Sequence, residues 1–165
     1  MDYNIRQGSS WDIPALAAMV GETILCVNRR DYTLRQVKAW AGRASCRERW
    51  AELFASELVF WVAEQGGKIV GVSSVDPHGY LHSLFVHKDF QGQGIATALL
   101  FRAQDWAAGK GAGELTTEAS ITARPFFMKN GFFQEQEQVV EVSGVTMNNF
   151  RMRKILAEDG RNTGK

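Results

Sequence analysis

The stretch Gln91-Gly92-Gln93-Gly94-Ile95-Ala96 is the most informative part of this sequence. It follows a strand-like run at residues 80–86 and opens an amphipathic helix that we expect from Gly94 to Ala108. A glycine-rich turn at a helix N-terminus leaves several backbone N–H groups unpaired, and the helix dipole adds partial positive charge there. The segment therefore suits a phosphate or diphosphate, although many turns of this kind bind nothing.

Two well-known phosphate-binding loops do not match this turn. A dinucleotide-binding fingerprint has Gly or Ala where this chain has Thr97, and it usually lies in a first βαβ unit rather than past the middle of a chain. A P-loop needs Gly-Lys-Ser/Thr before its helix, and Ala96-Thr97-Ala98 contains no lysine.

The turn instead resembles the pyrophosphate loop of the GNAT superfamily of N-acetyltransferases, which has the pattern Q/R-x-x-G-x-G/A. Gln91, Gly94 and Ala96 fill its three defined positions. Residues 118–132 are similar to a second segment of that family, D-A-S-x-x-A-x-x-F-Y-x-x-x-G-F. The two motifs in this order indicate a bacterial GNAT N-acetyltransferase whose acceptor is unassigned.

The resemblance implies an α+β fold with a GNAT-like mixed, mostly antiparallel sheet flanked by helices. The periodicity of the sequence predicts the order β-α-α-β-β-β-α-β-α-β-β. We expect strands at 3–6, 58–64, 69–76, 80–86, 114–119, 132–142 and 145–155. We expect helices that begin at Ser9 or Ser10, at Thr33, at the glycine turn and at Ser120, with a further helical stretch from Ser45.

The resemblance also implies acetyl-CoA as co-substrate. In the family, a bulge separates the strand ending at Leu84-Phe85-Val86 from the strand at 114–119, and the pantetheine arm lies in the gap. Leu84 and Val86 can equally be plain core residues. The cofactor-binding residues expected in this way are Leu84, Phe85, Val86, Gln91, Gly92, Gln93, Gly94, Ile95, Ala96, Thr97, Ser120 and Phe127.

His82 is the first candidate for the general base that takes a proton from the acceptor amine. The run at 80–86 is similar to the strand H-L-H-x-L-x-V of arylalkylamine N-acetyltransferases, with Tyr80 in place of the first histidine. The period of two in a strand places Tyr80 and His82 on one face, and histidine titrates near neutral pH. The alternative is a histidine that is only hydrogen-bonded beside the sheet. His78 and His87 are expected in exposed loops.

Glu118 and Ser120 are further catalytic candidates. Glu118 is a second possible base, or else a solvated carboxylate or an acceptor for the following helix. Many family members carry a tyrosine that protonates the departing thiolate, but this chain has Phe127 there, which cannot donate a proton. Ser120 offers a hydroxyl for this step, or it only caps the next helix. A thiol of pKa about 8.5 is in any case a fair leaving group.

Composition sets further limits. A chain of 165 residues predicts one domain, 1–157, with a flexible tail at 158–165. A net charge of +1 argues against nucleic acid or an anionic membrane as partner. Cys26 and Cys46 form no metal-binding cluster, so we expect no metal and a reduced, cytoplasmic protein. The longest apolar run, 58–63, is too short to span a bilayer, and the N-terminus lacks the features of a secretion signal.

These observations predict an N-acetyltransferase that moves an acetyl group from acetyl-CoA to a primary amine of a small molecule or peptide, by direct attack in a ternary complex. Neither cysteine lies near a motif, which disfavours a covalent relay. Phe127 motivates the alternative of an acyl-CoA-binding or sensing module with little turnover, and a longer acyl donor is a third possibility.

The sequence leaves the acceptor and the oligomeric state, monomer or homodimer, open. The first two helices, their loop and the final hairpin are expected to form the acceptor side, with Trp40, Trp50 and residues 28–32 and 147–150. The two tryptophans can equally be core residues, and the arginines of the loop can be merely solvated.

Overall fold

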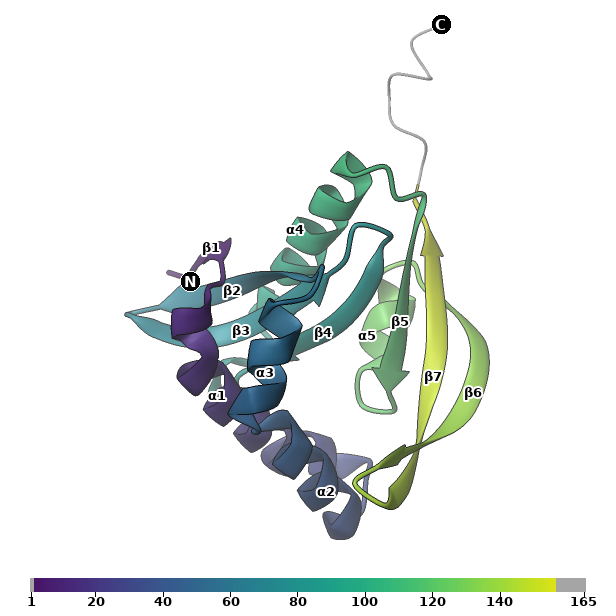
Figure 1. The fold of residues 1–165 in the computed structure, drawn as a ribbon. Helices are drawn as coiled ribbons and strands as arrows, with labels where there is room; N and C mark the ends of the chain where they lie inside the picture. The colour runs from purple at the N-terminus through teal and green to yellow at the C-terminus, as the bar shows by residue number, and fades with distance from the viewer. Residues whose placement is uncertain (1, 157–165) are drawn as a thin grey trace, which may run out of the picture.

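The computed structural model describes residues 2–156, so the tail predicted at 158–165 lies outside the described residues. A mixed sheet has the strand order β1-β2-β3-β4-β5-β7-β6 (Figure 1). Only β4 and β5 run parallel; every other neighbouring pair is antiparallel. The strands are β1 Asn4–Gln7, β2 Val59–Gln65, β3 Lys68–Val75, β4 Tyr80–Val86, β5 Glu114–Ser120, β6 Phe133–Val142 and β7 Val145–Ile155. The predicted fold class is therefore confirmed.

The helices also follow the predicted order. They are α1 Ile13–Cys26, α2 Leu34–Ala44, α3 Arg47–Phe54, α4 Ile95–Gly109 and α5 Arg124–Lys129, with short 3-10 turns at Ser10–Asp12, Asn28–Arg30 and Lys88–Phe90. The capping box expected at Thr33 is present, because its hydroxyl accepts from the N–H of Gln36 at 3.1 Å and the Gln36 side chain accepts from the N–H of Thr33 at 2.9 Å. One boundary differs: Ser120 ends β5, and α5 begins only at Arg124.

The alternation of β2 divides the core between the two faces of the sheet. Phe60 and Val62 join the cluster that α1, α2 and α3 build on one face. Ala63 joins the cluster on the other face, where α4 supplies Leu99. Trp61 points to the same side, and the guanidinium of Arg102 on α4 lies 5.1 Å from its ring centroid. The sheet is thus covered on both faces, which fixes α1 and α4 on opposite sides.

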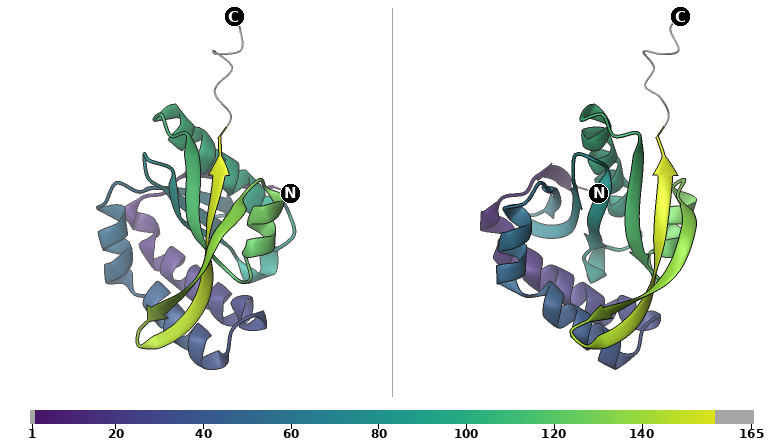
Figure 2. Two further views of the ribbon diagram at one scale, coloured as in Figure 1. Left: turned by 90° about the vertical axis from the view of Figure 1, so that its right-hand side faces the viewer. Right: turned by 45° about the vertical axis from the view of Figure 1, so that its right-hand side comes forward.

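The C-terminal hairpin of β6 and β7 reaches back to the N-terminal helices. Figure 2 shows the tip of this hairpin beside α2. The Gln36 amide on α2 donates to the carbonyl of Thr146 at 3.0 Å. The buried hydroxyl of Tyr32 donates to the carbonyl of Asn148 at 2.7 Å and accepts from the N–H of Ile121 at 2.9 Å. These hydrogen bonds join the N-terminal helical region to the C-terminal hairpin and to the segment after β5, beside one cleft.

The segment Ser10–Arg30 is apolar and long enough to meet the length and composition criteria for a membrane span. Half of its apolar window is buried in the structure, and Leu16, Val20 and Ile24 of α1 are at most 1% exposed. A core helix passes the same criteria, so this helix is weak evidence for a membrane span.

Candidate active site

The cleft begins where β4 and β5 stop pairing. They are paired only at Tyr80 with Thr116 and at Leu81 with Thr117, and the Thr117 hydroxyl donates to the Leu81 carbonyl at 2.8 Å. Beyond this point the two strands diverge, as Figure 1 shows. β5 continues on β7 as far as Ser120. The second half of β4 therefore presents an open edge, as the family resemblance implies.

A bulge in β4 lies at the start of this opening. Ser83 is opposite Ser74 on β3, but Leu81 is opposite Val75, so His82 is an extra residue with no partner on β3. The hydroxyl oxygens of Ser74 and Ser83 lie 2.6 Å apart in the core and hold the register there. The rings of Tyr80 and His82 meet edge-on with centroids 6.1 Å apart, which confirms that they share a face.

The glycine turn has the backbone geometry that a diphosphate site requires. Gly92 has φ +73° and Gly94 has φ +83°, and a Cβ at either position would meet nothing within 4 Å. Among residues 2–156, no acceptor is found for the backbone N–H groups of residues 92–97, and the first helical bond runs from Ala98 to the Gly94 carbonyl. These unpaired donors lie at the N-terminus of α4 and face an open approach.

Gln91 and Ile95 act on the turn in other ways. The Gln91 amide donates to the Val86 carbonyl at 2.6 Å, which ties the turn to the end of β4. Ile95 is 1% exposed and packs in the core, so only its main chain can reach a ligand.

One cleft of about 540 Å³ joins the turn, the gap and the N-terminal helices. Most of the predicted site residues line it, namely His82, Leu84, Phe85, Val86, Gln91, Ala96, Glu118, Ser120 and Phe127. The others, Gly92, Gln93, Gly94, Ile95 and Thr97, belong to the turn but do not line it. Leu84 and Phe85 also pack against the core, so these two residues both line the cleft and contribute to core packing.

The comparisons with known proteins agree with this geometry. Residues 28–155 match the family model described as an acetyltransferase (GNAT) domain. The chain belongs to the GNAT acetyltransferase family. Its members transfer acyl groups from acetyl-CoA, so this chain is an acetyl-CoA-dependent acyltransferase by family.

Three relatives illustrate the GNAT assignment. The chain is 36% identical over 152 residues to the uncharacterized N-acetyltransferase YafP of Escherichia coli K12, covering 92% of this chain and 95% of that protein. It is similar to a GCN5-related N-acetyltransferase from Rhodopseudomonas palustris, with a TM-score of 0.89, 28% identity, and 94% and 97% coverage. PaiA N-acetyltransferase from Thermoplasma acidophilum, solved with coenzyme A, shares the fold with a TM-score of 0.78 at 19% identity, with 94% and 99% coverage.

His82 is the histidine that lines this GNAT cleft. Burial lowers the pKa of its imidazole, and the charges of Arg49 and Arg43 lower the pKa further, while Glu118 opposes them. The ring makes no hydrogen bond within the described part of the chain, and its Nδ1 is buried without a partner. The lowered pKa favours the neutral imidazole, which is the state that accepts a proton.

The other two catalytic candidates differ in exposure. Glu118 is an exposed carboxylate that accepts from the Gln138 amide at 3.3 Å. Ser120 is half-buried and accepts from the N–H of Ala123 at 3.0 Å, so it closes the turn before α5 rather than capping the helix itself. Its hydroxyl proton remains available to the cleft.

Phe127 is 3% exposed and packs edge-on against Phe126 and Phe132. The position of the usual tyrosine of the family is therefore filled by an apolar ring. Thr122, which the sequence analysis did not single out, lines the cleft with a buried hydroxyl that has no partner.

The expectation for His87 was wrong, whereas His78 is exposed as predicted. His87 is 7% exposed, and its Nδ1 accepts from the N–H of Asp89 at 3.0 Å, so it caps the turn at Lys88–Phe90. Burial, and then the charge of Lys68, lowers the pKa of its imidazole.

Sequence reasoning also missed Arg43 and Arg49, which line the cleft from α2 and α3. The signal for Arg49 was its place next to Trp50, a core residue whose indole donates to the Ala44 carbonyl at 2.6 Å. Within residues 2–156, no group of three or more His, Cys, Asp or Glu side chains is arranged to hold a metal ion.

Proposed function

We propose that this protein transfers an acetyl group from acetyl-CoA to the primary amine of a small molecule or peptide by direct attack in a ternary complex. The observation that carries the proposal is a single cleft that is lined both by Gln91 and Ala96 of the glycine turn, whose N–H groups at 92–97 are unpaired, and by His82. An anion-binding turn and a neutral base are what this reaction needs at its two ends.

The proposed donor site follows the open edge of β4. The diphosphate would be bound by the main chain of residues 92–97, where two positive-φ glycines leave room for it. The pantetheine arm would lie along Leu84–Val86, whose main chain is not paired with β5. Coenzyme A bound to PaiA is consistent with this use of the fold.

The proposed chemistry is one acyl transfer. The amine nitrogen forms a bond to the acetyl carbon, the carbon–sulfur bond breaks, and coenzyme A leaves as a thiolate. The proton of the amine goes to His82, directly or through water. Glu118 supports this role electrostatically, because its charge favours the protonated imidazole that forms.

The tyrosine that usually protonates the thiolate in the family is replaced by Phe127. The hydroxyls of Ser120 and Thr122 line the cleft and could donate the proton instead, and a thiolate whose thiol has a pKa of about 8.5 can also leave unassisted. Neither cysteine lines the cleft, which supports direct attack over a covalent acyl-enzyme.

The test is turnover with acetyl-CoA and a broad panel of primary amines, followed by free-thiol release and by the mass of the acetylated product. We expect thiol release that depends on one class of amine and a fall of about 100-fold or more in kcat for His82→Gln. His78→Gln is the matched control, because His78 is exposed and does not line the cleft. Silence across the panel in a protein that binds acetyl-CoA would instead favour the binding or sensing module that Phe127 suggests.

A further inference from the structure

The lip of the cleft formed by α2 and α3 carries two positively charged side chains. Arg43 and Arg49 line the cleft, and neither guanidinium makes an ion pair or hydrogen bond within residues 2–156. Arg30, by contrast, pairs with Asp31 at 3.6 Å. Arg43 is exposed, whereas Arg49 is half-buried. A half-buried guanidinium without a partner is costly, so Arg49 is suited to an anion that arrives with a ligand.

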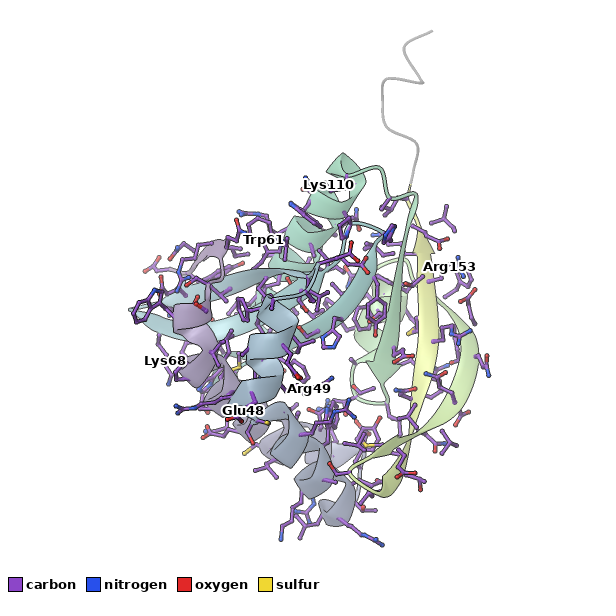
Figure 3. All side chains as sticks on the ribbon, in the orientation of Figure 1. Glu48, Arg49, Trp61, Lys68, Lys110 and Arg153 are labelled. Carbon is purple, nitrogen blue, oxygen red and sulfur yellow. The ribbon has the colours of Figure 1, made fainter. Side chains whose placement is uncertain are left out.

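The helix that carries Arg49 is anchored in the core by the next residue. Trp50 is 4% exposed, lies tilted against Phe60 with ring centroids 5.9 Å apart, and donates through its indole N–H to the carbonyl of Ala44. This anchor fixes the rotation of α3. Figure 3 shows Arg49 on the side of α3 that faces β4 and β5.

The positive lip lies close to the proposed reacting end of the cleft. The charges of Arg49 and Arg43 both act on His82, and the charge on Arg49 also acts on Tyr80. Burial and the nearby Arg43 lower the pKa of Arg49 itself. The two carboxylates that line the cleft, Glu118 and Glu141, make no ion pair with either arginine.

The opposite wall offers an acceptor. Oδ1 of Asn149 is buried without a hydrogen-bond partner and lines the cleft from β7. Donors on one wall and an acceptor on the other match a molecule with an anionic group at one end and N–H donors at the other.

We propose that the acceptor is an amine that also carries a carboxylate, bound by Arg49 with Arg43 beside it, so that its nitrogen lies between His82 and Asn149. Arg49 is thereby a specificity residue, and the substrate class is a small amino acid-like molecule rather than a neutral alkylamine. This inference rests on the proposed function and narrows its acceptor.

The test compares acceptors that differ only in charge. ω-Amino acids with two to five methylene groups are assayed against the amides of the same length, whose amines have similar basicity. We expect kcat/KM at least tenfold higher for the best acid than for its amide. Arg49→Gln is expected to remove that preference by raising KM for the acid far more than for the amide, and Arg35→Gln, an exposed change on α2 outside the cleft, is the control.

Equal rates for acid and amide, or an equal loss on both in Arg49→Gln, would overturn the inference. A second measurement separates it from the proposed function. Pentanoate, which cannot be acetylated, is titrated by calorimetry into the protein saturated with coenzyme A. We expect Arg49→Gln to weaken binding at least tenfold and Arg35→Gln to leave it unchanged, even if no amine is turned over; binding that does not depend on Arg49 would refute the anion site.

Discussion

Substitution of Gly94 tests the diphosphate site most directly. Gly94 is the N-cap of α4 with φ +83°, and a Cβ there would meet nothing within 4 Å. An alanine therefore introduces only backbone strain, about 1–2 kcal/mol of folding free energy. A glutamate adds the same strain and, in addition, a carboxylate beside the proposed diphosphate.

The size of the charge effect follows from Coulomb's law. Two unit charges about 5 Å apart at an effective dielectric constant of about 20 interact by about 3 kcal/mol. Gly94 is exposed, so solvent and salt reduce this by roughly half. We expect the Kd for acetyl-CoA to rise about 10- to 100-fold in Gly94→Glu relative to Gly94→Ala.

Calorimetry with acetyl-CoA measures both constants, and thermal unfolding establishes that both variants are folded. We expect Gly94→Ala to bind within about threefold of the unaltered protein, since it adds no charge. The difference between the two variants should shrink as sodium chloride is raised, because the repulsion is screened. If Gly94→Glu bound acetyl-CoA as tightly as Gly94→Ala, the assignment of the glycine turn to the diphosphate would be wrong.

Three further predictions concern other residues of the protein. Because the pKa of His82 is lowered from 6.5, the fall in kcat/KM that protonation of His82 causes should lie below pH 6.5, and Arg49→Gln should move that limb to higher pH in a pH–rate profile. Tyr32→Phe leaves a backbone carbonyl and an N–H without their partner, so urea unfolding should show a loss of about 1–3 kcal/mol; an unchanged midpoint would show that water replaces the bonds. Gly79→Ala places a Cβ 2.0 Å from the Glu114 carbonyl oxygen at φ +95°, and we expect a loss of roughly 3 kcal/mol or more in thermal unfolding, whereas Gly66→Ala, which meets no neighbour, should cost far less.

Sequence reasoning worked where the signal is local. The glycine turn, the strand at 80–86 and the capping box at Thr33 each depend on residues within a few positions of one another. The turn type and the helix start follow from the backbone preferences of glycine and of N-cap residues, which are read directly from the sequence. The placement of Tyr80 and His82 on one face likewise needed only the period of a strand.

Contacts between residues far apart in the chain could not be predicted from the sequence. The two hydrogen bonds of Tyr32 join residues that are separated by 116 and by 89 positions, and no periodicity in the sequence predicts these bonds. The burial of His87 arises because the chain after β4 folds back over α1 and β3, with its N–H donating to the Val70 carbonyl. Arg49 faces the cleft only because Trp50 fixes the rotation of α3, which is a tertiary effect.

His82 combines two features in one residue, because it is both the proposed base and the bulge of β4. The residue that would take the proton is also the surplus residue that breaks the β3–β4 register, so the base and the opening beside it come from one insertion. Deleting His82 would let Leu81 and Ser83 follow each other directly opposite Val75 and Ser74, which would restore the regular β3–β4 register, whereas replacing it would leave the bulge intact. A substitution at this position would therefore remove the proposed base and keep the bulge, but loss of the position would remove both at once.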